Sequence, residues 1–156
     1  MPNPNQRQTH GNPSRSAPPR GRSQETSSFG IPRDDLKRIL DGTDPQKMVQ
    51  VAEEIARDQL LAGREKVTTS QIRNIYGTVK MLEGRGLSDD VLFKLILLKP
   101  QLAYAAGRHD KVPGMQVLRR VLSDCIDLVY EKKERFDNFC KFFEAILAYH
   151  RAEGGK

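Results

Sequence analysis

Cysteine and histidine, which often act in catalysis, bind metals or form disulfides, are scarce in this sequence. Its 156 residues include two cysteines, three histidines and no tryptophan. Cys125 and Cys140 form neither a Cys-x-x-Cys pair nor a dense framework, which excludes a disulfide-rich secreted domain. Both fall on apolar helical stripes, so we expect them to be buried thiols rather than metal ligands.

Long apolar segments are also missing. The longest run, Val91 to Leu98, is interrupted by Lys94 and is far shorter than the ~18 residues that a membrane-spanning helix needs. The N-terminus has no apolar core of a secretory signal. We therefore expect a soluble, intracellular protein with no membrane contact.

Patterns typical of a catalytic or metal site do not occur. His10, His109 and His150 are too widely spaced to suggest a metal site or a base beside a nucleophile. There is no glycine-rich phosphate loop. Asp127 and Glu144 lie on predicted helices without a partner that the sequence reveals, so an ordinary helix-face charge is the simpler interpretation. The sequence predicts a binding protein that is not an enzyme and uses no cofactor or metal.

Positive charge is concentrated in the middle of the chain. The net charge is +6, and residues 64–120 hold eleven lysines and arginines against five acidic residues. A basic region in an otherwise balanced domain is typical of a nucleic-acid binder, although a solvated cationic surface has the same composition. Charge alone leaves both interpretations open.

The first thirty residues differ from the rest of the chain. They hold five of the nine prolines and four arginines against one glutamate. Such a segment cannot bury enough apolar surface to offset the entropy of ordering it. We expect a disordered basic tail over residues 1–30 and a single helical domain over residues 31–156.

Apolar residues in the remainder recur at three- and four-residue steps, the period of a helix. Helices are expected at 33–40, from Pro45 to the stop at Gly63, at 69–82, at 89–99, at 101–106, from Pro113 to a break near Lys132, and from Phe136 to His150. No segment is typical of a strand except Val91–Leu98, where the capping residues Ser88, Asp89 and Asp90 favour a helix. The predicted fold is all-α, a compact bundle of five to seven helices.

Three details of this bundle are specific enough to test. Thr69 or Ser70 is expected to cap the central helix. Val91–Leu98 is apolar nearly all round, which predicts the helix at the centre of the core. Pro100 is expected to kink or restart that helix, and Gly107 to close the second piece.

Two cations flank a glycine on the central helix. At about 100° per residue, Arg73, Gly77 and Lys80 fall on one shoulder beside the apolar stripe. A glycine inside an exposed helix costs roughly 1 kcal/mol relative to alanine, and close approach of a backbone or a phosphate is one reason to accept that cost. Simple tolerance of a weak residue near a helix end is the other interpretation.

Three blocks of sequence together resemble one family. They are TTSQIRNIY at 68–76, LKPQLAYAAGR at 98–108 and FFEAILAYHRAEGGK at 142–156. Their order and spacing resemble the small helical subunit of the Csm complex, the type III-A CRISPR effector of prokaryotes. The likeness covers roughly residues 45–156. The small subunit of the type III-B complex, also helical and basic, is less similar.

The resemblance implies a non-catalytic RNA-binding small subunit of a cytoplasmic antiviral defence ribonucleoprotein. Its implied partners are the CRISPR RNA and the target RNA, the backbone subunit, the large polymerase-like subunit and further copies of itself. Such a subunit would contact the target RNA backbone along the guide–target duplex. Sequence would be read by base pairing, as in Cas9-type effectors, so no base-reading device is needed.

The residues predicted to contact the RNA backbone are seven cations expected to form one groove. They are Arg73, Lys80, Arg85, Lys99, Arg108, Lys141 and Arg151. Stacking on aromatic residues is not expected, because Tyr76, Tyr104 and the phenylalanines fall on apolar stripes typical of a core. The alternatives are a protein-interaction scaffold without RNA contact and a small DNA-binding protein. The latter is least favoured because the helix after Gly84-Arg85-Gly86 is mostly apolar.

Overall fold

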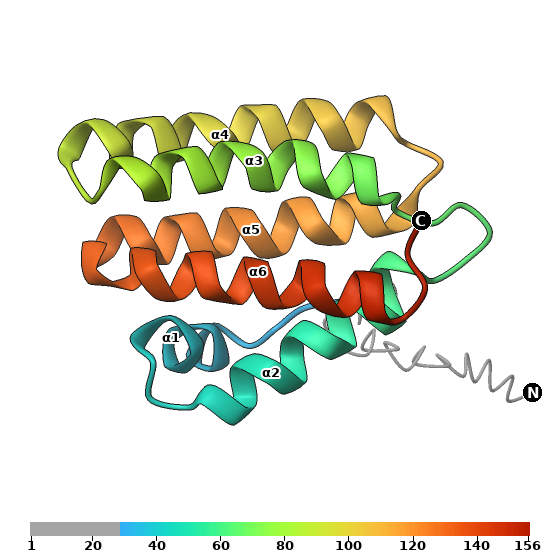
Figure 1. The fold of residues 1–156 in the computed structure, drawn as a ribbon, viewed down its shortest axis with the longest axis horizontal. Coiled ribbons are helices and arrows are strands. Elements are labelled where there is room, and N and C mark those ends of the chain that lie inside the picture. Colours follow the sequence, from blue (N-terminus) through green and yellow to red (C-terminus); the bar gives the residue numbers. More distant parts are fainter. Residues whose placement is uncertain (1–28) are drawn as a thin grey trace, which may run out of the picture.

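The computed structural model describes residues 29–156 (Figure 1). The disordered tail predicted for residues 1–30 lies outside this range except for Phe29 and Gly30. Six α-helices are present: α1 (Arg33–Asp41), α2 (Pro45–Glu54), α3 (Thr69–Arg85), α4 (Asp89–Arg108), α5 (Pro113–Glu131) and α6 (Phe136–Ala152). A π-helix η1 (Ile55–Leu60) continues α2, and a 3-10 turn η2 (Lys133–Arg135) joins α5 to α6. The described residues contain no strand, and the predicted all-α fold is confirmed.

Helices α3 to α6 form an antiparallel four-helix bundle. Figure 1 shows α3 and α4 in one layer above α5 and α6, with α1 and α2 covering the far side of the second layer. Helix α4 packs on α5 and α3 packs on α6, while α2 and α1 contact α6. The layer of α3 and α4 therefore has one face in the core and the other in solvent.

The core is continuous between the layers because α5 and α6 are apolar on more than one face. Four phenylalanines of α6 are fully or almost fully buried, at 136, 139, 142 and 143. Phe143 meets Tyr76 of α3 edge to face, with ring centroids 5.3 Å apart. Cys125 and Cys140 are buried free thiols, as predicted. Burial raises the pKa of the Cys140 thiol to about 12, so it stays protonated and inert at neutral pH.

Helix caps fix where α3 and α4 begin. The Thr68 hydroxyl accepts a hydrogen bond from the Gln71 amide, and the Gln71 side chain accepts one from the Thr68 amide. This capping box replaces the predicted cap at Thr69 or Ser70, because Thr69 is already helical and buried. Ser88 caps α4 by accepting from the Val91 amide, as expected.

Helix α4 differs from its prediction in two respects. It runs unbroken from Asp89 to Arg108 through Pro100 and Gly107, so the predicted restart is wrong. Burial of Leu98 and Leu102 on either side of the proline offsets the local cost of about 3 kcal/mol. Val91–Leu98 is also not at the centre of the core, since Phe93 is 63% exposed. No helix in residues 29–156 is long and apolar enough to cross a membrane.

Candidate nucleic-acid interface

The seven predicted cations lie on three helices of the bundle. Helix α3 carries Arg73, Lys80 and Arg85, α4 carries Lys99 and Arg108, and α6 carries Lys141 and Arg151. All are exposed except Lys99, which is half-buried. The seven cations differ in whether a carboxylate pairs with them and in which end of the bundle they occupy.

Arg73 and Arg108 lie at the same end of the α3–α4 layer. Helix α3 begins where α4 ends, so the first turns of α3 adjoin the last turns of α4 (Figure 1). Arg108 lines a shallow hollow of about 150 Å³ between the two helices, together with Gln71 and Asn74. Arg73 does not line this hollow: it lies two residues after Gln71, so at about 100° per residue its side chain leaves α3 on the other flank, the shoulder that also carries Lys80. Arg73 and Arg108 therefore share one end of the layer but leave it from different flanks.

Further cations lie near this pair on the loops 61–68 and 109–112. These loops meet at the same end, because Val67 contacts Gly114 at the start of α5. We call this surface the basic end and define it by five exposed cations: Arg64, Lys66, Arg73, Arg108 and Lys111. No carboxylate of residues 29–156 forms an ion pair with any of them. Glu65 and Asp110 are the acidic residues of the two loops.

The sequence interpretation missed Arg64, Lys66 and Lys111. They lie in loops, and neither loop has a period that assigns its side chains to a face. The only signal for them was their place in the basic stretch 64–120.

Lys80 lies on the seam between α3 and α6 and is partly neutralised. Its ammonium group is 3.3 Å from the Glu83 carboxylate. The pKa of Lys80 is raised, first by the hydrogen bond to Glu83 and then by Tyr76 and by the charge of Glu83. This cation is less available to an external anion than Arg73.

Gly77 lies between Arg73 and Lys80 on the exposed surface of α3. A Cβ atom placed on Gly77 would meet no atom of the described chain within 4 Å. Packing inside the described part of the protein therefore does not require this glycine. The surface above it is open to a ligand.

Lys99 and Arg108 point in nearly opposite directions from α4. Nine residues separate them on one unbroken helix, which at about 100° per residue places them about half a turn apart. Lys99 faces α5, where its ammonium group is 2.5 Å from the Asp127 carboxylate. Asp127 thus has the partner that the sequence did not reveal.

The remaining three cations are dispersed. Arg85 ends α3, at the far end of the layer from Arg73. Lys141 and Arg151 share the exposed face of α6 with Asp137 and Glu144. Arg151 is nearest to the basic end, because the Lys156 carbonyl that follows it accepts a hydrogen bond from the Thr69 amide at 2.8 Å.

The side chains that most often bind metals or act in catalysis, those of His, Cys, Asp and Glu, do not form a cluster in the described part of the chain. Across residues 29–156, no three His, Cys, Asp or Glu side chains are placed to hold a metal ion. His150 is fully buried, and its Nε2 lies 2.7 Å from the Val67 carbonyl.

The chain matches known proteins over most of its described length. Residues 42–156 match the family model described as Csm2 Type III-A. The "CRISPR system Cms protein Csm2" of Enterococcus italicus is 32% identical over 115 residues, which cover 64% of this chain and 81% of that protein. The protein of the same description from Streptococcus thermophilus is 29% identical over 97 residues, covering 60% of this chain and 78% of that protein. No solved structure matches significantly.

Proposed function

Because this chain belongs to the type III-A Csm2 family, we propose that it is a non-catalytic subunit of a CRISPR effector that holds an RNA backbone on its basic end. The RNA is the target strand paired with the CRISPR RNA. Arg73 and Arg108 are the principal contacts, and the other predicted cations contribute less because ion pairs or distance separate them from this pair.

The observation that carries this proposal is the set of unpaired cations at one end of the α3–α4 layer. Five exposed cations lie there without a carboxylate partner in the described chain. Such cations attract phosphates regardless of the base sequence. Sequence specificity would come from the base pairs of the guide–target duplex.

Gly77 supports the same surface. It has no packing role within the described residues and sits on the shoulder of α3 that Arg73 also occupies. A helix surface without a Cβ atom lets a sugar-phosphate backbone approach closely.

Packing beside neighbouring subunits is the second part of the proposal. Helix α4 presents an exposed apolar stripe in which Phe93 is 63%, Leu97 is 45% and Tyr104 is 71% exposed. Tyr104 and Phe93 were predicted to be core residues, and that prediction is wrong for both. An exposed stripe of large apolar side chains favours contact with another protein surface. The backbone subunit, the large polymerase-like subunit and further copies of this chain are the proposed neighbours.

The proposal is tested by RNA binding of the full chain carrying Arg73→Ala and Arg108→Ala. Each lost phosphate contact should weaken single-strand RNA binding about fivefold at about 0.1 M salt, so the pair should lose about 25-fold. Fluorescence anisotropy with an oligouridylate measures this loss. Duplex DNA and partner-subunit pull-downs, measured in parallel, distinguish the DNA-binding and scaffold alternatives.

A matched control removes the same charge elsewhere. Arg38→Ala with Lys133→Ala takes away two exposed cations from α1 and η2, far from the basic end. The control should bind RNA within twofold of the wild type. Equal affinity of both double variants would contradict the proposed interface.

A further inference from the structure

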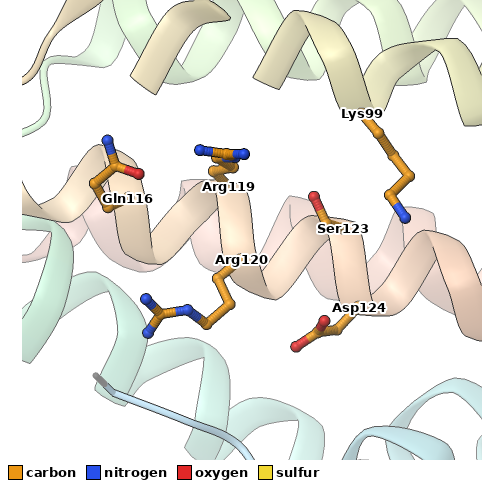
Figure 2. A pocket seen from close by; sticks show the side chains of 6 residues that line it. All are labelled: Lys99, Gln116, Arg119, Arg120, Ser123 and Asp124. Carbon is orange, nitrogen blue, oxygen red and sulfur yellow. The ribbon is translucent and has the colours of Figure 1, made fainter. Parts of the chain in front are cut away.

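A second cationic site lies between α4 and α5, on the flank of α4 opposite Arg108. It is a pocket of about 340 Å³ (Figure 2). Its lining residues are Lys99, Gln116, Arg119, Arg120, Ser123 and Asp124. Figure 2 shows Lys99 extending from α4 toward α5, with Arg119 and Ser123 on the side of α5 that faces α4, while Arg120 and Asp124 point away from α4. The helix period produces this arrangement, since Arg119 and Ser123 are four residues apart on one face of α5.

The pocket contains hydrogen-bond donors that the described fold does not use. Arg119 forms no ion pair with a carboxylate in residues 29–156. Arg120 uses one guanidinium nitrogen to donate to the Phe29 carbonyl at 3.2 Å. Gln116 donates to the Ala106 carbonyl at 3.3 Å. The Arg119 guanidinium and the Ser123 hydroxyl therefore remain as lining donors that no bond within residues 29–156 uses, and they lie about one helical turn apart on α5.

The charge of the pocket suits a monoanion. Lys99, Arg119 and Arg120 bring three positive charges, and Asp124 with the Lys99 partner Asp127 brings two carboxylates. One positive charge remains when both carboxylates are ionised. Burial raises the pKa of Asp124, and the charge of Asp127 raises it further, so the opposing carboxylate is held less firmly in its anionic form.

We propose that this pocket binds one phosphodiester group of an RNA strand. The Arg119 guanidinium and the Ser123 hydroxyl donate to its free oxygens, and Lys99 adds positive charge while it remains paired with Asp127. A phosphodiester carries a single negative charge, which matches the charge left over in the pocket. Guanidinium groups bind phosphate oxygens with a fixed fork of donors, a geometry that favours this ligand.

The identity of the strand as RNA rests on the proposed function, but the pocket is separate from the basic end. Arg108 and Lys99 leave α4 about half a turn apart. A variant of one site therefore leaves the other intact, and the two proposals can fail independently.

The test compares Arg119→Gln with the control Arg38→Gln, an exposed cation of α1 that does not line the pocket. Binding of a hydroxyl-terminated oligouridylate to the full chain is measured across salt concentrations. Arg119→Gln should lower the salt slope by about 0.7 and the affinity about fivefold at about 0.1 M salt. The control should change neither quantity. Equal behaviour of the two variants would overturn the pocket proposal.

A second measurement identifies the ligand and shows which proposal fails. The Arg119 Nε–Hε signal is followed by nuclear magnetic resonance as hydroxyl-terminated uridylyl-uridine is added, which contains one diester and no terminal phosphate. The signal should shift in the wild type and equally in the Arg73→Ala, Arg108→Ala variant. An unchanged Arg119 signal overturns the pocket alone, whatever the basic-end variant does to RNA affinity. A larger shift with uridine monophosphate, or with an acidic peptide, would replace the diester with a terminal phosphate or a protein carboxylate and overturn the proposal.

Discussion

Arg135 and Arg108 lie near opposite ends of the bundle, and their surroundings differ. The Arg135 side chain is 10% exposed and donates to the Asp41 carboxylate at 2.8 Å and to the Leu128 carbonyl at 3.0 Å. Arg108 is exposed, and its guanidinium forms no ion pair in the described chain. The difference separates cations that hold the helices together from cations that remain available for an external anion.

The neighbours of the two arginines extend this contrast. Lys132 also approaches Asp41, at 3.6 Å, and Arg33 pairs with Glu131 at 2.5 Å. The hydrogen bond from Arg135 is the first cause that lowers the pKa of Asp41, so this carboxylate remains charged well into the acid range. We call these five residues the ionic cluster. The ion pairs of this cluster connect α1 to the turn between α5 and α6. The cations of the basic end form no such ion pair within residues 29–156.

The largest expected effect is on stability at the ionic cluster. Arg135→Met removes the buried guanidinium that donates to the Asp41 carboxylate and to the Leu128 carbonyl. This loss should lower the free energy of unfolding by about 3 kcal/mol. Urea denaturation measures this loss. Arg38→Met, at an exposed cation on α1, should change stability by less than about 0.5 kcal/mol. Similar values for both variants would show that the ionic cluster is not structural.

The next largest effect tests whether the loops at the basic end are tightly packed, even though the cations there have no ion-pair partner. A Cβ atom at Gly114 would lie 2.7 Å from Val67 Cγ2 and 2.9 Å from both the Gln59 carbonyl oxygen and Leu60 Cα. Backbone atoms can shift only at a large energetic cost, so Gly114→Ala should lower the free energy of unfolding by about 2 kcal/mol.

The matched control for this substitution is Gly107→Ala on α4. Nothing lies within 4 Å of its added Cβ atom. It should be neutral, or stabilising by up to about 1 kcal/mol. Thermal unfolding of both variants checks the difference, and a Gly114→Ala protein as stable as the control would mean that the two loops at the basic end are loosely held.

A smaller effect, of opposite sign, is expected at Gly77. Because space above it is open, Gly77→Ala should stabilise α3 by up to about 1 kcal/mol. If the RNA backbone passes close to the helix beside Arg73, the same substitution should also weaken RNA binding. Unfolding and anisotropy measured on one preparation separate the two effects. A more stable variant with unchanged affinity would place the RNA away from Gly77.

The helices and their starts could be predicted from the sequence because local chemistry determines them. Asp44 before Pro45, Ser88 before two aspartates and Pro113 each give a helix start that the structure confirms. The cap of the central helix was predicted one or two residues too late, at Thr69 or Ser70, since Thr68, Thr69 and Ser70 all have a hydroxyl. Only the reciprocal bond with Gln71 selects Thr68.

Burial on α4 and the partners of the cations could not be predicted in this way. The run Val91–Leu98 has no polar face that would show which side turns to the core. Phe93 and Leu95 therefore look equally apolar in the sequence, yet Phe93 is exposed and Leu95 is buried. Pairing depends on how one helix packs on another, as between Lys99 of α4 and Asp127 of α5. The seven cations were selected by charge, and only the fold distinguishes the paired from the unpaired ones.

The most direct test of this distinction compares the salt dependence of RNA binding for two double variants of equal charge. Arg73→Ala with Arg108→Ala changes the basic end, and Arg33→Ala with Lys132→Ala changes the ionic cluster. Both must first be shown to be folded by circular dichroism. The first variant should lower the salt slope by about 1.4, and the second should leave it unchanged. Equal slopes for the two variants would contradict the claim that unpaired cations at the basic end hold the RNA.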